Sequence, residues 1–246
     1  MEIPSHCPIA LLLPLVLLAC DDTPIPTEQP VGSKQETSTQ ELTAGASSAR
    51  QRPFEVAQAF FELNTTFHDM GFQVFLDDEA WDHVSLSDPQ GNTVFGIHAE
   101  GRLARLGITE LHFESEEPAP SEVRALFPSG RYTFHGRTLE GTSLVTQVEV
   151  SQHMPGAPRF TPRNGQLVDK SNLVVRWDPT GTEQVEVIIE QDELGHSMDV
   201  LLSGTTTSLT VPPQFLRRGR EYKIELQAVT ENGNRTVAES TFRTKA

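Results

Sequence analysis

The chain is poor in cysteine and in positive charge. Only two of its 246 residues are cysteines, Cys7 and Cys20. The 34 Asp and Glu residues outnumber the 19 Lys and Arg residues, which gives a formal net charge of −15 at pH 7. An acidic surface repels nucleic acid and anionic lipid head groups, so the composition argues against nucleic acid as a partner.

The sequence also lacks the common catalytic motifs. It contains no nucleophile elbow, phosphate-binding loop, dinucleotide fingerprint or zinc-protease motif. The histidines at positions 68, 83, 98, 112, 135, 153 and 196 stand singly, so none forms a ligand pair by spacing. Adjacent carboxylates such as Asp77 and Asp78 point to opposite faces of a strand. We therefore predict no catalytic residue, no cofactor and no enzymatic activity, while acid pairs formed across strands stay open.

The N-terminus has the pattern of an export signal. Ile9 to Leu18 are apolar except for Pro14, and this run of ten residues is too short to span a hydrocarbon core of roughly 30 Å. The segment Leu17-Leu18-Ala19-Cys20 resembles the bacterial lipobox, in which a small residue precedes a cysteine that is acylated and becomes the new N-terminus. One departure is that no Lys or Arg precedes the apolar run.

The lipobox resemblance implies a signal peptide over residues 1–19 and a lipidated Cys20 that anchors a cell-envelope lipoprotein in a membrane. Two or more acyl chains give stable anchoring. Cys7 leaves with the signal, so no thiol remains for a disulfide or a metal. Asp21 resembles the signal that retains lipoproteins in the inner membrane, a rule that varies between bacterial groups. An ordinary secretory signal cut after Ala19 is the alternative.

Residues 20–52 are rich in Pro, Thr, Ser, Glu and Gln and show no apolar periodicity, which predicts a disordered tether. After Pro53 short apolar runs alternate with turn signals, which predicts an all-β chain. We expect two β-sandwich domains in tandem, at 53–154 and 155–246, separated by the prolines at 155 and 158.

The first domain is expected to be immunoglobulin-like or jelly-roll-like. Its predicted strands cover 57–64, 71–77, 83–87, 93–99, 110–114, 130–134 and 144–153, with one short helix at 121–127. Aromatic residues bury large areas in small domains, and they are expected to supply much of its core: Phe60, Phe72, Trp81, Phe95, Phe113 and Tyr132.

The second domain resembles a fibronectin type III domain over residues 157–246. Leu173 to Trp177 is similar to the family's strand B with its inward tryptophan. Leu216 and Tyr222 match the leucine, turn and tyrosine that lead into strand F, where the resemblance implies a tyrosine corner. The family's integrin-binding Arg-Gly-Asp is absent, because Arg220 follows Gly219.

The segment from Glu62 to Phe72 is similar to one found in uncharacterised bacterial envelope proteins that pair it with a fibronectin type III domain. In those relatives the loop is richer in Asp, Asn and Gly, as if built for a hard cation. Here only Glu62, Asn64 and Asp69 are candidate ligands. Calcium takes six to eight oxygens, so we predict no metal site on these three alone.

The leading functional hypothesis is a non-enzymatic, lipid-anchored envelope protein whose sandwiches bind a protein or a polymer. The alternatives are a structural spacer or assembly factor of the envelope, and a carbohydrate-active or hydrolytic protein that uses cross-strand carboxylates.

Overall fold

The computed structural model describes residues 51–246. The predicted signal peptide, the lipidation of Cys20 and nearly all of the predicted tether fall on residues 1–50, outside this range. Within residues 51–246 the structure is all-β, as predicted, with one short α-helix and two 3-10 turns. No helix in this part of the chain is long and apolar enough to cross a membrane.

The N-terminal part is organised around one long strand, β3 (Asp69–Ser87). Its first half pairs with β2 (Val56–Asn64) and β5 (Ile108–Glu114), and its second half pairs with β4 (Thr93–His98) and β6 (Gly130–Thr138). β6 continues to β7 (Ser143–Val150), which pairs in parallel with β1 (Gln51–Arg52). Helix α1 (Pro120–Leu126) precedes β6. β3 therefore belongs to two layers of the N-terminal part, because its two halves pair with different strands. Strands can pass from one sheet to another in this way at a bulge or bend.

The prediction of two separate strands at 71–77 and 83–87 was wrong, because β3 continues through residues 78–82 between them. The pairing of β3 shifts register between Asp77 and Trp81 and again between Trp81 and His83. Such bulges bend a strand without ending it. The Asp78 carboxylate is satisfied within the bend, since it accepts from the Arg52 guanidinium at 2.5 and 2.7 Å and from the Glu55 amide at 2.9 Å.

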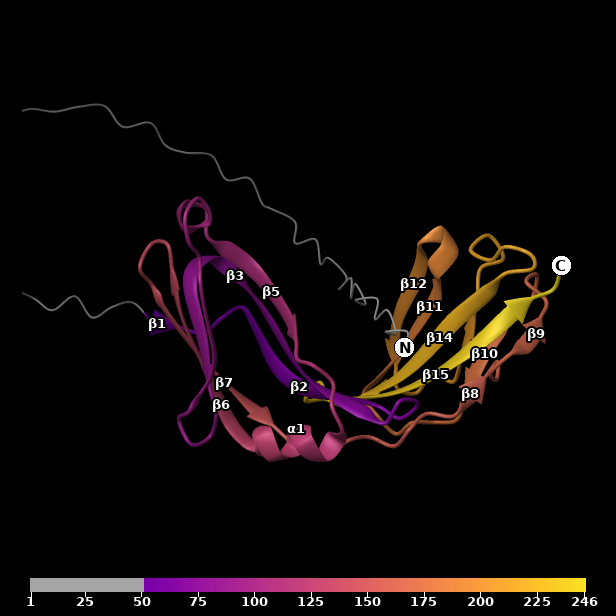
Figure 1. The fold of residues 1–246 in the computed structure, drawn as a ribbon, viewed down its shortest axis with the longest axis horizontal. Coiled ribbons are helices and arrows are strands. Elements are labelled where there is room, and N and C mark those ends of the chain that lie inside the picture. Colours follow the sequence, from indigo (N-terminus) through magenta and orange to yellow (C-terminus); the bar gives the residue numbers. More distant parts are fainter. Residues whose placement is uncertain (1–50) are drawn as a thin grey trace, which may run out of the picture. The chain divides into compact units, whose positions relative to one another are not determined.

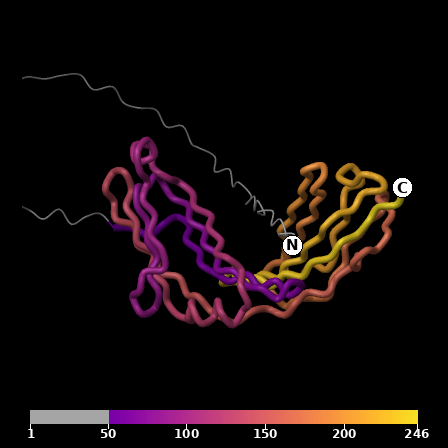
Figure 2. The backbone as a smooth tube through the Cα atoms, viewed as in Figure 1, coloured from indigo at the N-terminus to yellow at the C-terminus, as the bar shows by residue number. Residues whose placement is uncertain are grey.

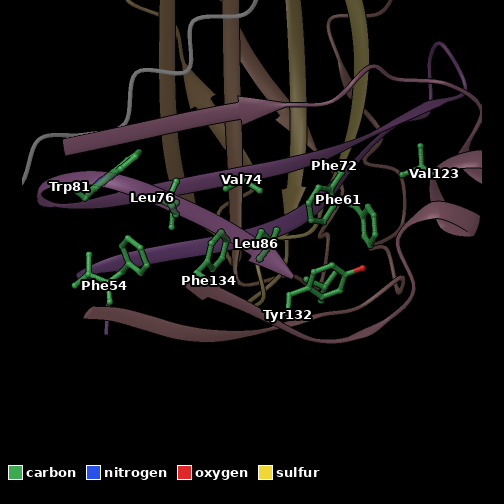
Figure 3. Packing of buried hydrophobic residues seen from close by; sticks show 14 of the residues in the cluster. Phe54, Phe61, Phe72, Val74, Leu76, Trp81, Leu86, Val123, Tyr132 and Phe134 are labelled. Atoms are coloured by element: carbon green, nitrogen blue, oxygen red, sulfur yellow. The ribbon is translucent and has the colours of Figure 1, made fainter. Parts of the chain in front are cut away.

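The N-terminal core is aromatic, as Figure 3 shows. Of the predicted core residues, Phe72, Trp81 and Tyr132 are fully buried. Phe95 and Phe113 are only partly buried against this core, 5.7 Å apart between ring centroids. Three further aromatic residues that were not predicted for this core are also buried: Phe54, Phe61 and Phe134.

The C-terminal part is a sandwich of the fibronectin type III kind. One sheet has the order β13 (Ser208–Thr210), β10 (Val174–Trp177), β8 (Phe160–Thr161). The other runs β15 (Arg235–Thr244), β14 (Glu221–Val229), β11 (Gln184–Gln191), β12 (His196–Ser203), and β9 (Gln166–Val168) pairs with β15. Three strands facing the four that run from β15 to β12, with β9 added beside β15, give a sandwich of the fibronectin type III kind.

The tyrosine corner predicted at Tyr222 is present. Its hydroxyl accepts a hydrogen bond from the Arg217 amide at 2.7 Å, and its ring stacks on Phe242 with centroids 5.3 Å apart. Trp177 faces inward and is 5% exposed. Ile224 and Leu226 share the buried face with Tyr222.

The two parts share one continuous sheet. β2 pairs in parallel with β15, with Glu62 opposite Arg235, so the indigo and yellow strands run side by side in Figures 1 and 2. Residues 151–159, which contain the predicted boundary, hold no strand. Asn234 joins three segments: its Oδ1 accepts from the Phe61 amide at 2.9 Å, and its Nδ2 donates to the carbonyls of Ser151 and His153 at 2.6 and 2.9 Å.

Candidate functional site

Three carboxylates meet where β2 and β5 flank β3. Oxygens of Glu62, Glu114 and Glu117 lie within 4.8 Å of one another. Gly71 of β3 makes room for them, because a Cβ atom there would lie 3.3 Å from Glu117 Cγ and Oε1. These residues come from two strands and the segment after β5, so tertiary pairing alone brings them together. We refer to Glu62, Glu114 and Glu117 as the carboxylate triad.

The triad is electrostatically strained. Burial raises the pKa of Glu62 to about 8, against the opposing attraction of Arg235, and Glu114, Glu225 and Glu117 add repulsion. Partial burial and the charge of Glu114 raise the pKa of Glu117 to about 7. Like charges this close favour a bound proton or a bound cation. The three carboxylates of the triad carry six oxygens, the lower end of the six to eight that calcium takes, so all three would have to bind through both oxygens, or water would have to complete the coordination.

Arg235 stands opposite Glu62 in the sheet, and its charge favours the ionised form of that carboxyl group. Its Nη1 lies 2.7 Å from Glu186 Oε2, and the guanidinium stands 5.0 Å above the Phe60 ring centroid. Burial raises the pKa of Glu186 to about 7 despite this partner. Phe60, predicted as a core residue, is buried, but it packs beneath Arg235 at the junction of the two parts.

A second ion cluster lies on the neighbouring strands β14 and β15. Lys223 Nζ lies 2.6 Å from Glu225 Oε1 and 3.1 Å from Glu239 Oε2. Burial opposes the charge on Lys223, but the two carboxylates outweigh it and hold the pKa of Lys223 above its usual range. Asn64 Nδ2 donates to Glu239 Oε1 at 2.5 Å, which ties the N-terminal part to this cluster.

Beyond this cluster lies a groove of about 840 Å³, which we call the acidic groove. The turn between β2 and β3 contributes Phe67, whose side chain is 63% exposed. Five carboxylates line it, from the ends of β11 and β14, the 3-10 turn at Asp192–Leu194, and β15: Glu190, Asp192, Glu193, Glu221 and Glu239. Lys223 is the one lysine or arginine among the lining residues.

Ion pairs compensate only part of this charge. Glu193 pairs with Arg220, and Glu239 shares Lys223 with Glu225. Glu190, Asp192 and Glu221 line the groove and form no salt bridge among the described residues. The groove is therefore a negatively charged hollow with an aromatic ring at its side.

The structure separates the three predicted ligand candidates. Glu62 belongs to the carboxylate triad. Asn64 Oδ1 accepts from the amides of Thr66 and Phe67, at 2.9 and 3.3 Å, so it shapes the turn. Asp69 adds repulsion to Glu117 but is not a triad member. Glu114 and Glu117 were not predicted as site residues, because only the pairing of the strands brings them close to Glu62.

The histidines also differ from what spacing indicated, since β3 and β4 bring His83 and His98 into ring contact. The only signal in the sequence for this contact is the alternation of apolar and polar residues in each strand, which helps to set the register in which the two strands pair.

Comparisons with known proteins assign no family. No family model matches the sequence, and no curated protein matches it. Among solved structures, a fragment concerned with host cell surface retention of a 1.5-MDa bacterial ice-binding adhesin is 12% identical, covering 80% of this chain and 67% of that chain at a TM-score of 0.28. A two-domain fibronectin type III segment from chicken tenascin is 10% identical. The match covers 79% of this chain and 98% of that chain, with a TM-score of 0.29.

The BSP domain of a biofilm-associated protein is 19% identical, covering 77% of this chain and 29% of that chain, with a TM-score of 0.26. TM-scores of this size do not establish a shared fold. The assignment of the C-terminal part therefore rests on its own strand order.

Proposed function

We propose that this chain is a non-enzymatic, lipid-anchored envelope protein, held through Cys20, that binds a cationic segment of a partner protein in the acidic groove. The observation that carries the proposal is the groove itself: uncompensated carboxylates line a hollow of about 840 Å³ beside an exposed aromatic ring. Ligand sites commonly have volumes of about 300–1,000 Å³.

The chemistry of the lining favours Lys and Arg side chains. Glu190, Asp192 and Glu221 offer carboxylates for charge-assisted hydrogen bonds, which are stronger than neutral ones. Phe67 offers a ring face to a cation, an interaction that contributes about 0.5–1 kcal/mol at an exposed site. An extended basic peptide satisfies both groups, whereas an acidic polymer is repelled.

The test is calorimetric titration of the full chain with a Lys/Arg-rich peptide and with a peptide in which Glu replaces each basic residue. The triple variant Glu190→Gln/Asp192→Asn/Glu221→Gln removes the uncompensated charges. At about 0.5–1 kcal/mol for each exposed pair, we expect affinity for the basic peptide to fall about 10- to 100-fold. The acidic peptide should not bind.

A matched control has the same change in charge outside the groove: Glu140→Gln/Glu183→Gln/Glu231→Gln. These residues are exposed and do not line the groove. Equal weakening by both triple variants would mean that only the net charge attracts the peptide, and the groove proposal would be wrong. Phe67→Leu keeps an apolar side chain and should weaken binding about threefold through loss of the ring.

The anchor is tested independently. Intact-mass analysis of the native protein should show acyl chains on a Cys20 N-terminus, and the protein should fractionate with membranes. Cys20→Ser should release it to the soluble fraction. A soluble or unlipidated native protein would refute the anchor but leave the groove binding unaffected.

A second candidate function is hydrolysis by the carboxylate triad. Glu62 and Glu117 have raised pKa values, as a general acid needs, and the triad's oxygens approach one another across strands. Turnover of a polysaccharide by the wild type that Glu62→Gln abolishes would favour this function. Absence of turnover across a panel of glycans and esters would count against it.

A further inference from the structure

An exposed loop of the N-terminal part presents leucines and arginines to solvent. The loop joins β4 to β5 and contains a 3-10 turn at Leu103–Arg105. Leu103 is 46% exposed and Leu106 is 75% exposed. Side chains three positions apart eclipse one another on a 3-10 turn, so the two leucines share one side of the loop. Arg102 and Arg105 share another side by the same spacing.

A third exposed leucine stands beside this loop. Leu139 follows β6 in the turn to β7 and is 36% exposed. Its amide donates to the carbonyl of Ala80 at 3.0 Å, and Ala80 also packs against Gly107 at the end of the loop. Three of the eight large apolar side chains that are exposed in residues 51–246 therefore gather at one end of the molecule. We call Leu103, Leu106 and Leu139 the leucine end.

The described part of the chain begins at the same end. β1 starts at Gln51, which pairs with Ser143 directly after the turn between β6 and β7. The Arg52 guanidinium bonds the Asp78 carboxylate at the bend of β3, next to the loop. Figure 1 shows β1 on the side of the N-terminal part that carries the loop between β4 and β5. The 30 residues between Cys20 and Gln51 therefore join this part beside the leucine end.

The arginines of the loop are available to bind an anion. Neither Arg102 nor Arg105 forms a salt bridge among the described residues. Glu100 is the one acidic residue of the loop at 99–107, so the loop has a net charge of +1 in a chain of −15. Nearby arginines neutralise three carboxylates of the β3 bend: Asp78, Glu79 and Asp82. Lipid head groups therefore do not repel the loop as they repel the rest of the acidic surface.

We infer that the leucine end rests on a phospholipid membrane, with its leucines in the interface and Arg102 and Arg105 on lipid phosphates. This inference rests on the anchor at Cys20 proposed above. Segments that lie in the membrane interface bury an apolar side that includes leucine and carry Lys or Arg on the other side. The planar guanidinium of arginine matches a phosphate group with two hydrogen bonds.

The anchor makes even a weak contact effective. A flexible chain of 30 residues has a root-mean-square span of about 30 Å, so the tether predicted for residues 20–52 would hold the leucine end near the bilayer. Docking on the membrane is then an intramolecular step with a high effective concentration. A second copy of the chain, by contrast, has to approach against the repulsion between two acidic bodies.

The experiment places a fluorescent reporter in the loop by the substitution Leu106→Trp. In the full chain with Cys7→Ser, Cys20 is coupled to a maleimide phospholipid in phosphatidylcholine vesicles with brominated acyl chains. This coupling fixes the anchor independently of native acylation. Trp81 and Trp177 are buried, and their background is subtracted with the chain that lacks the reporter. We expect brominated lipid to quench most of the reporter fluorescence, relative to vesicles without bromine.

Leu126→Trp is the matched control, because Leu126 is 70% exposed but lies on α1. α1 precedes the first residue of β6, whereas Leu139 follows its last residue. The same vesicles should leave the control reporter unquenched.

Two further changes test the side chains around the Leu106→Trp reporter. Arg102→Gln/Arg105→Gln should lower the ratio of membrane-bound to free loop about 3- to 30-fold, as expected for two exposed ionic contacts. Arg124→Gln/Arg163→Gln removes the same charge from exposed positions elsewhere and should leave the ratio unchanged. Leu103→Gln should lower the quenching.

An unquenched Leu106→Trp reporter, or equal quenching of Leu106→Trp and Leu126→Trp, would overturn the inference. Unchanged quenching after Leu103→Gln would also overturn it, because the introduced ring alone would then make the contact. A blue shift that grows with the density of protein on the vesicles, without quenching by bromine, would mean that a second copy covers the leucines. Intact-mass analysis tests the native anchor separately, so its failure is distinguishable from failure of this contact.

Discussion

Glu62 should make the protein less stable as the pH rises, and Glu62→Gln should remove most of this effect. Burial raises the pKa of Glu62 from 4.5 to about 8 in the folded protein. Between these values the folded state binds more protons than the unfolded state. Stability is therefore fully retained below pH 4.5 and falls as the pH rises to about 8.

The size of the effect follows from the same pKa. A rise from 4.5 to about 8 corresponds to about 5 kcal/mol against the charged carboxylate. The Glu62 side chain keeps some contact with solvent, and an effective protein dielectric near 20 reduces such penalties, so we expect about 2 kcal/mol. Glu62→Gln keeps the shape of the side chain without the charge. At pH 8.5 it should raise the Tm by about 4–8 °C.

The assay is thermal unfolding of the wild type and Glu62→Gln at pH 5 and pH 8.5, with Glu110→Gln as control. Glu110 is exposed on β5, so its replacement should change stability by no more than about 0.5 kcal/mol at either pH. At pH 5 Glu62→Gln should resemble the wild type. A variant no more stable than the wild type at pH 8.5 would refute the reasoning.

Adding Ca²⁺ tests whether the carboxylate triad is stabilised by a shared proton or by a shared cation. If millimolar Ca²⁺ at pH 8.5 stabilises the wild type and not Glu62→Gln, the triad holds a cation when its proton is lost. If Ca²⁺ has no effect on either protein, protonation alone accounts for the proximity of the carboxylates.

Three further substitutions test the packing that positions these sites, each by chemical denaturation. Tyr222→Phe removes the acceptor of the Arg217 amide and should cost about 1–2 kcal/mol, with an unchanged m-value. Asn234→Ala leaves the Phe61 amide and two carbonyls unpaired and should cost about 3 kcal/mol; a loss under about 1 kcal/mol would mean that water replaces the side chain. Gly136→Ala would place a Cβ atom 2.6 Å from Phe54 Cζ and should cost about 1–3 kcal/mol, whereas no loss would show that the ring moves freely.

Local patterns predicted most strands because apolar alternation and turn residues agree along the chain. The predicted ranges 93–99 and 110–114, and the strand expected from Leu173 to Trp177, fall on β4, β5 and β10 with small differences at their ends. β12 was not predicted. It lies at the end of the sheet order, and Leu201 is exposed between the partly buried Val200 and Leu202, so its apolar residues do not alternate cleanly with polar ones.

The candidate site could be predicted only in part, because its geometry comes from pairing between distant strands. Glu62 was selected from its own segment, but Glu114 and Glu117 reach it through the register of β3 with β2 and β5. His83 and His98 are fifteen positions apart and meet through one antiparallel pair. Sequence spacing describes neighbours along a single element, so it contains no information on these contacts.

Because the two parts share one sheet, we expect both of them together, and not one sandwich alone, to form the unit that binds a partner. Two tandem sandwiches, as predicted, would each carry their own surfaces. In the structure Phe67 comes from the N-terminal part, while the groove's carboxylates come from the C-terminal part. Asn64 and Glu239 link the two beside the groove, and β2 pairs with β15. A peptide that contacts both Phe67 and the carboxylates therefore needs both parts in place, so neither sandwich alone should reproduce the binding of the full chain.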